Sequence, residues 1–343
     1  MNKRNFGKLF LMLIFSILVI CLAIGIGSVH IPLKEQFYIF AGKIFSINVE
    51  DKVNMGTVSI LTTVRMPRAI LAFLVGGGLA VAGVVTQSIL QNPLASSYTL
   101  GVSSGAALGA AIITVCEISV PVLGLFLLPA GGFIGGFIVV IFVISVSQRI
   151  DHGVTSYTVV LTGMVASMFT NAILTLLSVL FVKHEHHIIG WTLGSFNGKR
   201  WYHVWILLVA DIVILILNMK NHRELDALSF GDEHAASLGV EVAKIKKRQL
   251  LYAAFLTGVS VCFTGTIGFI DLIAPHVSRK IVGATHRWTL PVSFLLGGSL
   301  MTIADLVART ALAPLEIPVG AVTALIGAPF FMWLYFGRGR SKL

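Results

Sequence analysis

Two short groups of polar side chains could do chemistry in this otherwise apolar chain. The first is His184-Glu185-His186-His187, because imidazoles and a carboxylate are suitable ligands for zinc, copper or iron. Consecutive side chains rarely converge on one ion without a preformed scaffold, so we interpret this run as a solvated loop. The second is Asp271 with His276, which could act as acid and base, but no nucleophile and base pair recurs at helical spacing. We therefore expect no catalytic residue and no metal site.

Nucleotide hydrolysis by this chain is not expected either. The phosphate-binding motif G-x-x-x-x-G-K-[ST] does not occur in the sequence. The nearest approach is Gly194 to Lys199, which has one residue too few and is followed by Arg200. Energy from ATP would therefore have to come from another chain.

A pair of arginines around a proline, Arg65-Met66-Pro67-Arg68, stands directly before the apolar run 69–89. Pro67 fixes its own φ and restricts Met66 before it, so both guanidinium groups are held stiffly at the mouth of a helix. With the amino terminus inside the cell they would face outside, against the usual charge bias of membrane proteins. They are candidates for contact with a partner protein, with lipid headgroups as the alternative.

The elements that must position these residues are membrane-spanning helices. The chain has 343 residues, of which 56% are hydrophobic and 12% charged, and its mean hydropathy is +0.91. A soluble domain of this length could not bury so much apolar surface, so the predicted fold class is an all-α polytopic membrane protein. The net charge of +10 does not indicate nucleic acid, because the basic residues are divided among short loops. Cys21, Cys116 and Cys262 have no metal-binding spacing, and we interpret them as buried packing residues.

About ten spans are predicted from the apolar runs, in a single transmembrane domain over residues 1–343. The runs are 9–29, 69–89, one beginning near 98, 122–146, 154–182, 204–219, 250–264, a broken region at 265–279, 290–308 and 319–336. The first run is too long for a signal peptide and no A-x-A site follows it, so we expect a retained helix. The distribution of Lys and Arg between the loops places both termini in the cytoplasm.

Glycine and charged residues predict how some of these spans pack. Gly101, Gly105 and Gly109 are four residues apart, so one helix face has no side chains and a neighbour can approach closely. The run at 122–146 repeats this with Gly131, Gly132, Gly135 and Gly136. Asp305 and Arg309 lie on one helical face. The interruption at 265–279 predicts either a broken helix that lines a pathway or a proline kink satisfied by its neighbours.

The longest polar interruption runs from Lys220 to Arg248. Basic residues stand at its two ends and acidic residues between them, which predicts two amphipathic turns with basic anchors on the cytoplasmic side. We interpret this segment as a contact surface for another protein.

Several motifs, taken in order, resemble the permease subunits of the ABC importers that take up iron-siderophores, haem and vitamin B12. The matching fragments are Arg65-Met66-Pro67-Arg68, Gln87 with Asn92 to Ala95, Gly101 with Ser103 to Ala106, Gly231 to Gly239, Gly268-Phe269 with Pro275-His276 and Arg279, Ala304-Asp305 with Arg309, and Pro318 to Gly320 with Gly327 to Phe331. One fragment alone would be unspecific, but the series in register covers most of the chain. The sequence departs from this family at Asp271, where glycine is more common.

The resemblance implies a ten-helix permease of the vitamin B12 importer type that forms a pathway with a second copy or a homologue. It also implies an extracytoplasmic substrate-binding protein and cytoplasmic ATPase subunits, which bind ATP and Mg, while this chain binds no cofactor. The residues that match the family's ATPase-coupling positions, within the loop 220–248, are Gly231, Asp232, Glu233, Ala235, Ala236, Leu238 and Gly239. Those that match its docking arginines are Arg65, Arg68 and Arg309, and those that match its cytoplasmic gate are Asn92, Leu94, Thr155 and Ser156, the last two by a loose alignment.

The sequence therefore predicts a non-enzymatic transport subunit in the cell membrane that moves an iron-siderophore or a related metal chelate into the cytoplasm. An ion-coupled secondary transporter is the alternative, because about ten spans and glycine-broken helices also suit that class. Such carriers keep ionisable residues at mid-span, whereas Asp211, Asp271, Asp305 and His276 are placed near predicted ends or breaks. A membrane-embedded enzyme that uses Asp271 and His276 is a third class. The choice between siderophore, haem and cobalamin, and between a homodimer and a heterodimer, stays open.

Overall fold

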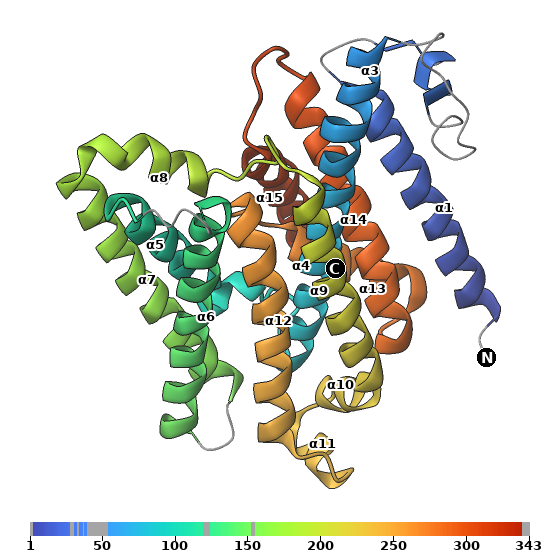
Figure 1. Ribbon diagram of the computed structural model, residues 1–343. Coiled ribbons are helices and arrows are strands. Elements are labelled where there is room, and N and C mark those ends of the chain that lie inside the picture. The colour runs from blue at the N-terminus through green and yellow to red at the C-terminus, as the bar shows by residue number, and fades with distance from the viewer. Residues whose placement is uncertain are drawn as a thin grey trace.

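The computed structural model describes residues 3–27, 31–32, 34–36, 38–39, 54–118, 124–151 and 155–337. All regular structure in these ranges is helical (Figure 1). Within these described ranges, six stretches are long and apolar enough to cross a membrane. They lie in α1 (Lys3–Gly25), the continuous helix Met55–Ile89, α6 (Gly124–Ile150), α7 (Ser156–Leu180), α9 (Trp201–Lys220) and α14 (His286–Thr310).

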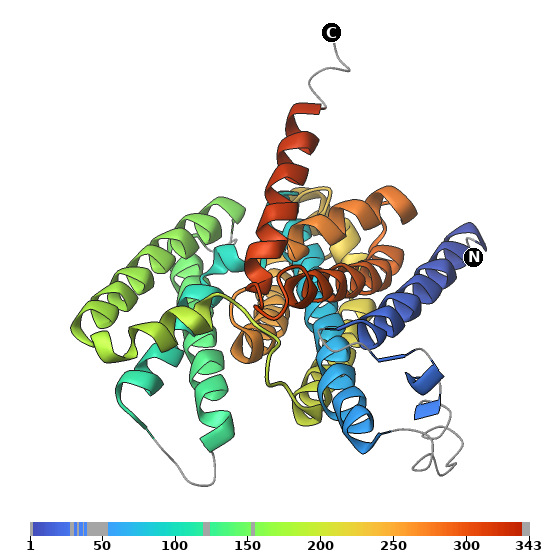
Figure 2. The same ribbon diagram turned by 90° about the horizontal axis from the view of Figure 1, so that it is seen from above.

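Four further helices follow the remaining predicted spans. They are α5 (Val102–Val115), α12 (Val242–Thr264), α13 (Ile270–Val282) and α15 (Val319–Gly337). The predicted break is confirmed, because α12 ends at Thr264 and the chain is not helical again until α13 begins. Helix α15 extends away from the other helices (Figure 2).

The second predicted span begins earlier than the sequence indicated. α3 (Met55–Ser59), the π-helix η1 (Ile60–Arg65) and α4 (Met66–Ile89) form one helix of 35 residues. A proline ring clashes with the preceding turn of an α-helix and leaves one carbonyl without a donor, and the wider π-helical turn absorbs this defect before Pro67. The expectation of arginines at a helix mouth is therefore wrong, because Arg65 and Arg68 lie within a continuous helix and are buried.

Helix α4 is the centre of the bundle. It packs against α9, α12, α13 and α14, and 94% of the most apolar window of the Met55–Ile89 helix is buried inside the chain. Small residues make this close packing possible. A Cβ atom on Gly76 would lie 2.3 Å from the carbonyl oxygen of Gly297 in α14, and one on Gly83 would lie 1.9 Å from that of Asp271 in α13. The outer helices α1 and α7 bury only 22% of the corresponding window and face outward.

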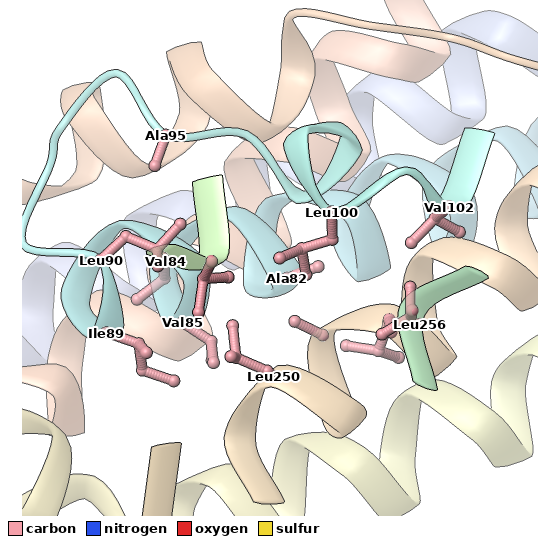
Figure 3. Close-up of a cluster of buried hydrophobic side chains, with 14 of the residues drawn as sticks. Ala82, Val84, Val85, Ile89, Leu90, Ala95, Leu100, Val102, Leu250 and Leu256 are labelled. Atoms are coloured by element: carbon pink, nitrogen blue, oxygen red, sulfur yellow. The ribbon is translucent and has the colours of Figure 1, made fainter. Parts of the chain in front are cut away.

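The main apolar core lies between α4, α12 and the start of α5. Figure 3 shows Val85 and Ile89 of α4 near Leu250 of α12, with Leu100 and Leu256 further along the same core. All these side chains are almost fully buried. Inside a bilayer such packing stabilises chiefly through van der Waals contact, because lipid tails are as apolar as leucine.

The glycine prediction for α5 and α6 is confirmed. A Cβ on Gly109 would lie 2.1 Å from the carbonyl oxygen of Gly131, and one on Gly105 would lie 2.7 Å from that of Gly135. The two backbones therefore touch along this face. The interpretation of the cysteines is confirmed for Cys262, which is buried, and is wrong for Cys21 and Cys116, which are exposed.

Candidate functional site

The polar segment 220–248 folds as α10 (His222–Leu228), α11 (Asp232–Ser237) and the first turns of α12, and it projects from the lower end of the bundle in Figure 1. We call this the α11 end. Asp232 fixes α11 to two other elements. Its Oδ2 lies 2.5 Å from Lys246 Nζ of α12, and its Oδ1 accepts a hydrogen bond of 2.9 Å from Gln91 Nε2, just after α4. The Lys246 side chain is only 1% exposed, so this ion pair supplies the partner that a buried charge requires.

The outer surface of α11 combines small and apolar side chains. Ala235 is buried, whereas Glu233 and Ala236 are exposed, and Leu238 and Phe230 are 62% and 80% exposed. Gly231 and Gly239 have φ angles of 120° and 82°, in the region that favours glycine, so they set the bends on either side of α11. An exposed apolar surface on a polar, projecting segment is typical of a protein contact.

His286, at the start of α14, joins three elements at the α11 end. Its Nδ1 lies 2.6 Å from Asp226 Oδ1 of α10, and its Nε2 lies 2.6 Å from Ser88 Oγ of α4. Burial raises the pKa of Asp226, but the hydrogen bonds from His286 outweigh this effect and hold that pKa below its usual range. The order Ser, His, Asp is that of a catalytic triad, but Ser88 and His286 are at most 5% exposed, so a substrate cannot reach the hydroxyl. We interpret this chain of contacts as structural.

The residues predicted to form a gate also lie at the α11 end. The α4–α5 loop, residues 91–97, begins at Gln91, whose φ of 49° is unusual for a residue with a side chain. Asn92 Oδ1 accepts a hydrogen bond of 2.9 Å from Leu94 N, and Leu94 is 51% exposed. Thr155 and Ser156 stand at the start of α7, where Ser156 Oγ donates to the carbonyl of Ile89 at 3.4 Å. Ser156 thus lies beside the end of α4, from which the loop that carries Asn92 and Leu94 leaves.

The three predicted docking arginines meet at the opposite end, which we call the Arg68 end. Arg68 forms hydrogen bonds of 2.9–3.2 Å with Asp305 of α14 and of 2.8 Å and 3.2 Å with Glu316. Arg309 lies 3.7 Å from Asp305, which confirms that these two residues share a helical face. Arg65 and Arg309 also donate to backbone carbonyls at the end of α1. All three arginines are at most 7% exposed.

A pocket of about 680 Å³ adjoins Arg68. Its wall includes Thr63 and Val64 on one side and residues 196–202, before and at the start of α9, on the other. Arg200 is exposed, and burial lowers the pKa of the half-buried Lys199. Three cationic residues, Arg68, Lys199 and Arg200, thus line part of this pocket.

Asp211 differs from its predicted placement near a span end. It lies near the middle of α9, is 3% exposed, and its Oδ2 has no hydrogen-bond partner among the described residues. A Cβ on Gly78 of α4 would lie 2.6 Å from Asp211 Oδ1, so the glycine provides room for the carboxylate. The backbone of His184 to His187 belongs to η3 (Val182–His184) and α8 (Glu185–Thr192), but the side chains of this run lie outside the described residues.

Comparison with known proteins agrees with this architecture. The model of the FecCD transport family matches residues 13–336. The chain belongs to the FecCD transport family. The hemin transport system permease HmuU of Yersinia pestis is 40% identical over 288 residues, which cover 82% of this chain and 85% of that protein. The iron dicitrate permease FecD of Escherichia coli is 38% identical over 275 residues, which cover 80% of this chain and 84% of that protein.

The structural comparison extends over nearly all of this FecCD-family chain. A solved chain described as a metal-chelate type ABC transporter in an inward-facing conformation has a TM-score of 0.83 and 29% identity, and the match covers 96% of this chain and 99% of that one. The protein is thus an all-helical ABC permease of the membrane, as the sequence predicted. Sequence reasoning missed the Ser88, His286 and Asp226 contacts, because these residues are far apart in the chain and follow no local pattern.

Proposed function

We propose that this chain is the membrane-spanning permease subunit of a binding-protein-dependent ABC importer that moves an iron-siderophore, or a related metal chelate, into the cytoplasm. The substrate class is supported by the relatives, which are named as transporters of hemin, iron dicitrate and iron hydroxamate. ATP would be hydrolysed, with Mg²⁺, on separate cytoplasmic subunits. A second copy or a homologue would complete the pathway.

The observation that carries this proposal is the form of the α11 end. A chain that belongs to an ABC permease family presents a short projecting helix with exposed Ala236 and Leu238, and this helix is tied to the interior through Asp232. The start of α1 lies at the same end, because Asn5 Nδ2 donates to the carbonyl of Val282 at the end of α13. Cytoplasmic placement of both the amino terminus and the polar segment therefore fits one orientation. We propose that the carboxyl terminus lies in the cytoplasm as well.

The first test is uptake into vesicles that contain the chain with its ATPase subunits and binding protein. We expect uptake of a ferric siderophore to require ATP on the side of the membrane that carries the ATPase subunits. Uptake should persist when ionophores remove ion gradients. Asp211→Asn, which keeps the size of the buried side chain, should leave this uptake within about twofold of the unmodified level. Uptake that needs an ion gradient and is lost in Asp211→Asn would instead establish the ion-coupled alternative, which uses mid-span carboxylates.

We propose that the polar segment couples ATP hydrolysis to movement of the spans, through Gly231 to Gly239. Ala236→Arg should abolish most uptake, because a bulky charge on the exposed face of α11 prevents it from seating against a partner surface. ATP hydrolysis by the partner should continue without transport. Ala236→Ser is the matched control and should transport normally. Normal uptake by Ala236→Arg, with the protein present in the membrane, contradicts this role.

We propose that Arg65, Arg68 and Arg309 form the docking region for the binding protein. The guanidinium groups of these arginines are already bound inside the chain. An acidic residue of the binding protein would therefore compete with Asp305 and Glu316 for them. Arg309→Gln is expected to weaken binding of the binding protein about tenfold at low salt, roughly the value of one well-placed charge pair. The exposed Arg200, changed to Gln, is the comparison variant. Unchanged affinity of Arg309→Gln at low salt would reject the docking assignment.

A further inference from the structure

Asp271, near the start of α13, binds the far end of the α4–α5 loop. Its Oδ2 accepts hydrogen bonds from Ser97 N at 3.1 Å, from Ser97 Oγ at 3.2 Å and from Ser96 Oγ. The residue is 1% exposed. Its backbone is fixed as well, because the carbonyl of Asp271 accepts a hydrogen bond from Gln87 Nε2 of α4 at 3.2 Å and packs against Gly83. Asp271 is therefore a rigid anchor for the loop.

The other end of the same loop is bound to a different element. Gln91 Nε2 donates to Asp232 Oδ1 at the start of α11, at 2.9 Å. The predicted gate residues Asn92 and Leu94 lie between the two attachments. One carboxylate in the polar segment and one in α13 thus hold opposite ends of a single short loop.

Two features indicate that the attachment to α13 can be released. Asp271 Oδ1 has no hydrogen-bond partner among the described residues, so a buried carboxylate is only half satisfied while the loop is bound. Water reaching Asp271 after release would satisfy this oxygen and offset part of the lost contacts. In addition, Gln91 and Phe269 both have positive φ angles, of 49° and 72°, and strained backbone of this kind is common at switching elements.

We propose that Asp271 is a positioning residue that fixes the Ser96–Ser97 end of the α4–α5 loop to α13, so that movement of α11, transmitted at Gln91, bends the loop instead of carrying it along as a whole. The role of this bending in transport rests on the proposed function. The attachment itself can be measured without transport.

The test measures how often the loop leaves its site. Ala95, inside the loop, is 3% exposed, so a cysteine placed there is protected while the loop is bound. Ala95→Cys is introduced into the full chain after Cys21, Cys116 and Cys262 are changed to serine. Labelling by a membrane-impermeant maleimide is then followed in inside-out vesicles. Asp271→Ala should raise the labelling rate about tenfold or more. It removes Oδ2, the oxygen that accepts the hydrogen bonds from Ser96 Oγ, Ser97 N and Ser97 Oγ.

Three variants make the result specific. Ser96→Ala with Ser97→Ala removes the two hydroxyl donors and should also raise the rate. Adding Asp271→Ala to this pair should produce a smaller increase than Asp271→Ala produces alone, because only the bond from Ser97 N is left to lose. Asp271→Asn keeps one acceptor oxygen and should label at an intermediate rate. Phe230→Cys, on the exposed part of the polar segment, should label equally in all backgrounds. If the Asp271→Ala protein fails to accumulate, the labelling rates of the double serine variant and of Asp271→Asn decide the result.

An unchanged labelling rate at Ala95→Cys in these variants, or fully additive effects, would overturn the inference. That failure differs from failure of the proposed function, which would appear as absence of ATP-dependent uptake by the unmodified complex. A bound loop with no uptake would leave Asp271 as the anchor of a loop in a protein of another function. Uptake with no change in labelling would retain the transporter and reject the anchor.

Discussion

Replacing Asp305 with alanine is expected to lower the free energy of unfolding by about 3–5 kcal/mol, because removing one partner of a buried ion pair leaves the other charge uncompensated. Asp305 is fully buried and contacts both Arg68 and Arg309. Its loss would leave two buried guanidinium groups competing for Glu316 and backbone carbonyls. Heating purified protein in detergent and measuring the fraction that stays monodisperse gives the change in stability.

Glu316→Gln is the matched control for that experiment. Glu316 binds the same guanidinium group as Asp305, but its side chain is 37% exposed, so water replaces the lost contact. We expect a loss of about 1 kcal/mol or less, as is usual for an exposed ion pair. Equal effects of the two substitutions would show that burial does not determine the strength of the Arg68 contacts.

Gly83→Ala is expected to prevent accumulation of folded protein, or to cost about 4 kcal/mol or more where protein is obtained. The added Cβ would lie 1.9 Å from the carbonyl oxygen of Asp271, and neither backbone can move without separating α4 from α13. Gly7→Ala in α1 is the control, since nothing lies within 4 Å of its added Cβ. That substitution should be neutral or slightly stabilising, because alanine favours helix over glycine by about 1 kcal/mol. Membrane levels and melting in detergent distinguish the two variants.

Local sequence patterns predicted the features that depend on residues close together in the chain. Three such features were predicted from residues close together in the chain. They are the glycine contact between α5 and α6, the break after Thr264, and the shared helical face of Asp305 and Arg309. The start of the second span was wrong, because Pro67 suggested a helix beginning and the π-helical turn that accommodates it has no clear sequence signature.

Contacts across the bundle could not be predicted in the same way. Arg68 and Glu316 are 248 positions apart, and Ser88 meets His286 across 198 positions, so only the packed helices bring them together. The family resemblance predicted that the arginines are docking residues, and the structure shows that their side chains are buried inside the chain. The sequence predicted where the α4–α5 loop and the polar segment lie along the chain, but not that Asp232 and Asp271 bind the two ends of that loop.

The enclosure of α4 has a consequence for biosynthesis. Helices α9, α12, α13 and α14, which pack against α4, are all translated after it. During synthesis α4 must therefore wait in the bilayer or beside the insertion machinery, with Arg68 lacking the carboxylate that α14 will supply. A ribosome that stalls before α14 would leave an incomplete chain with uncompensated charge at membrane depth, which membrane proteases could recognise and remove.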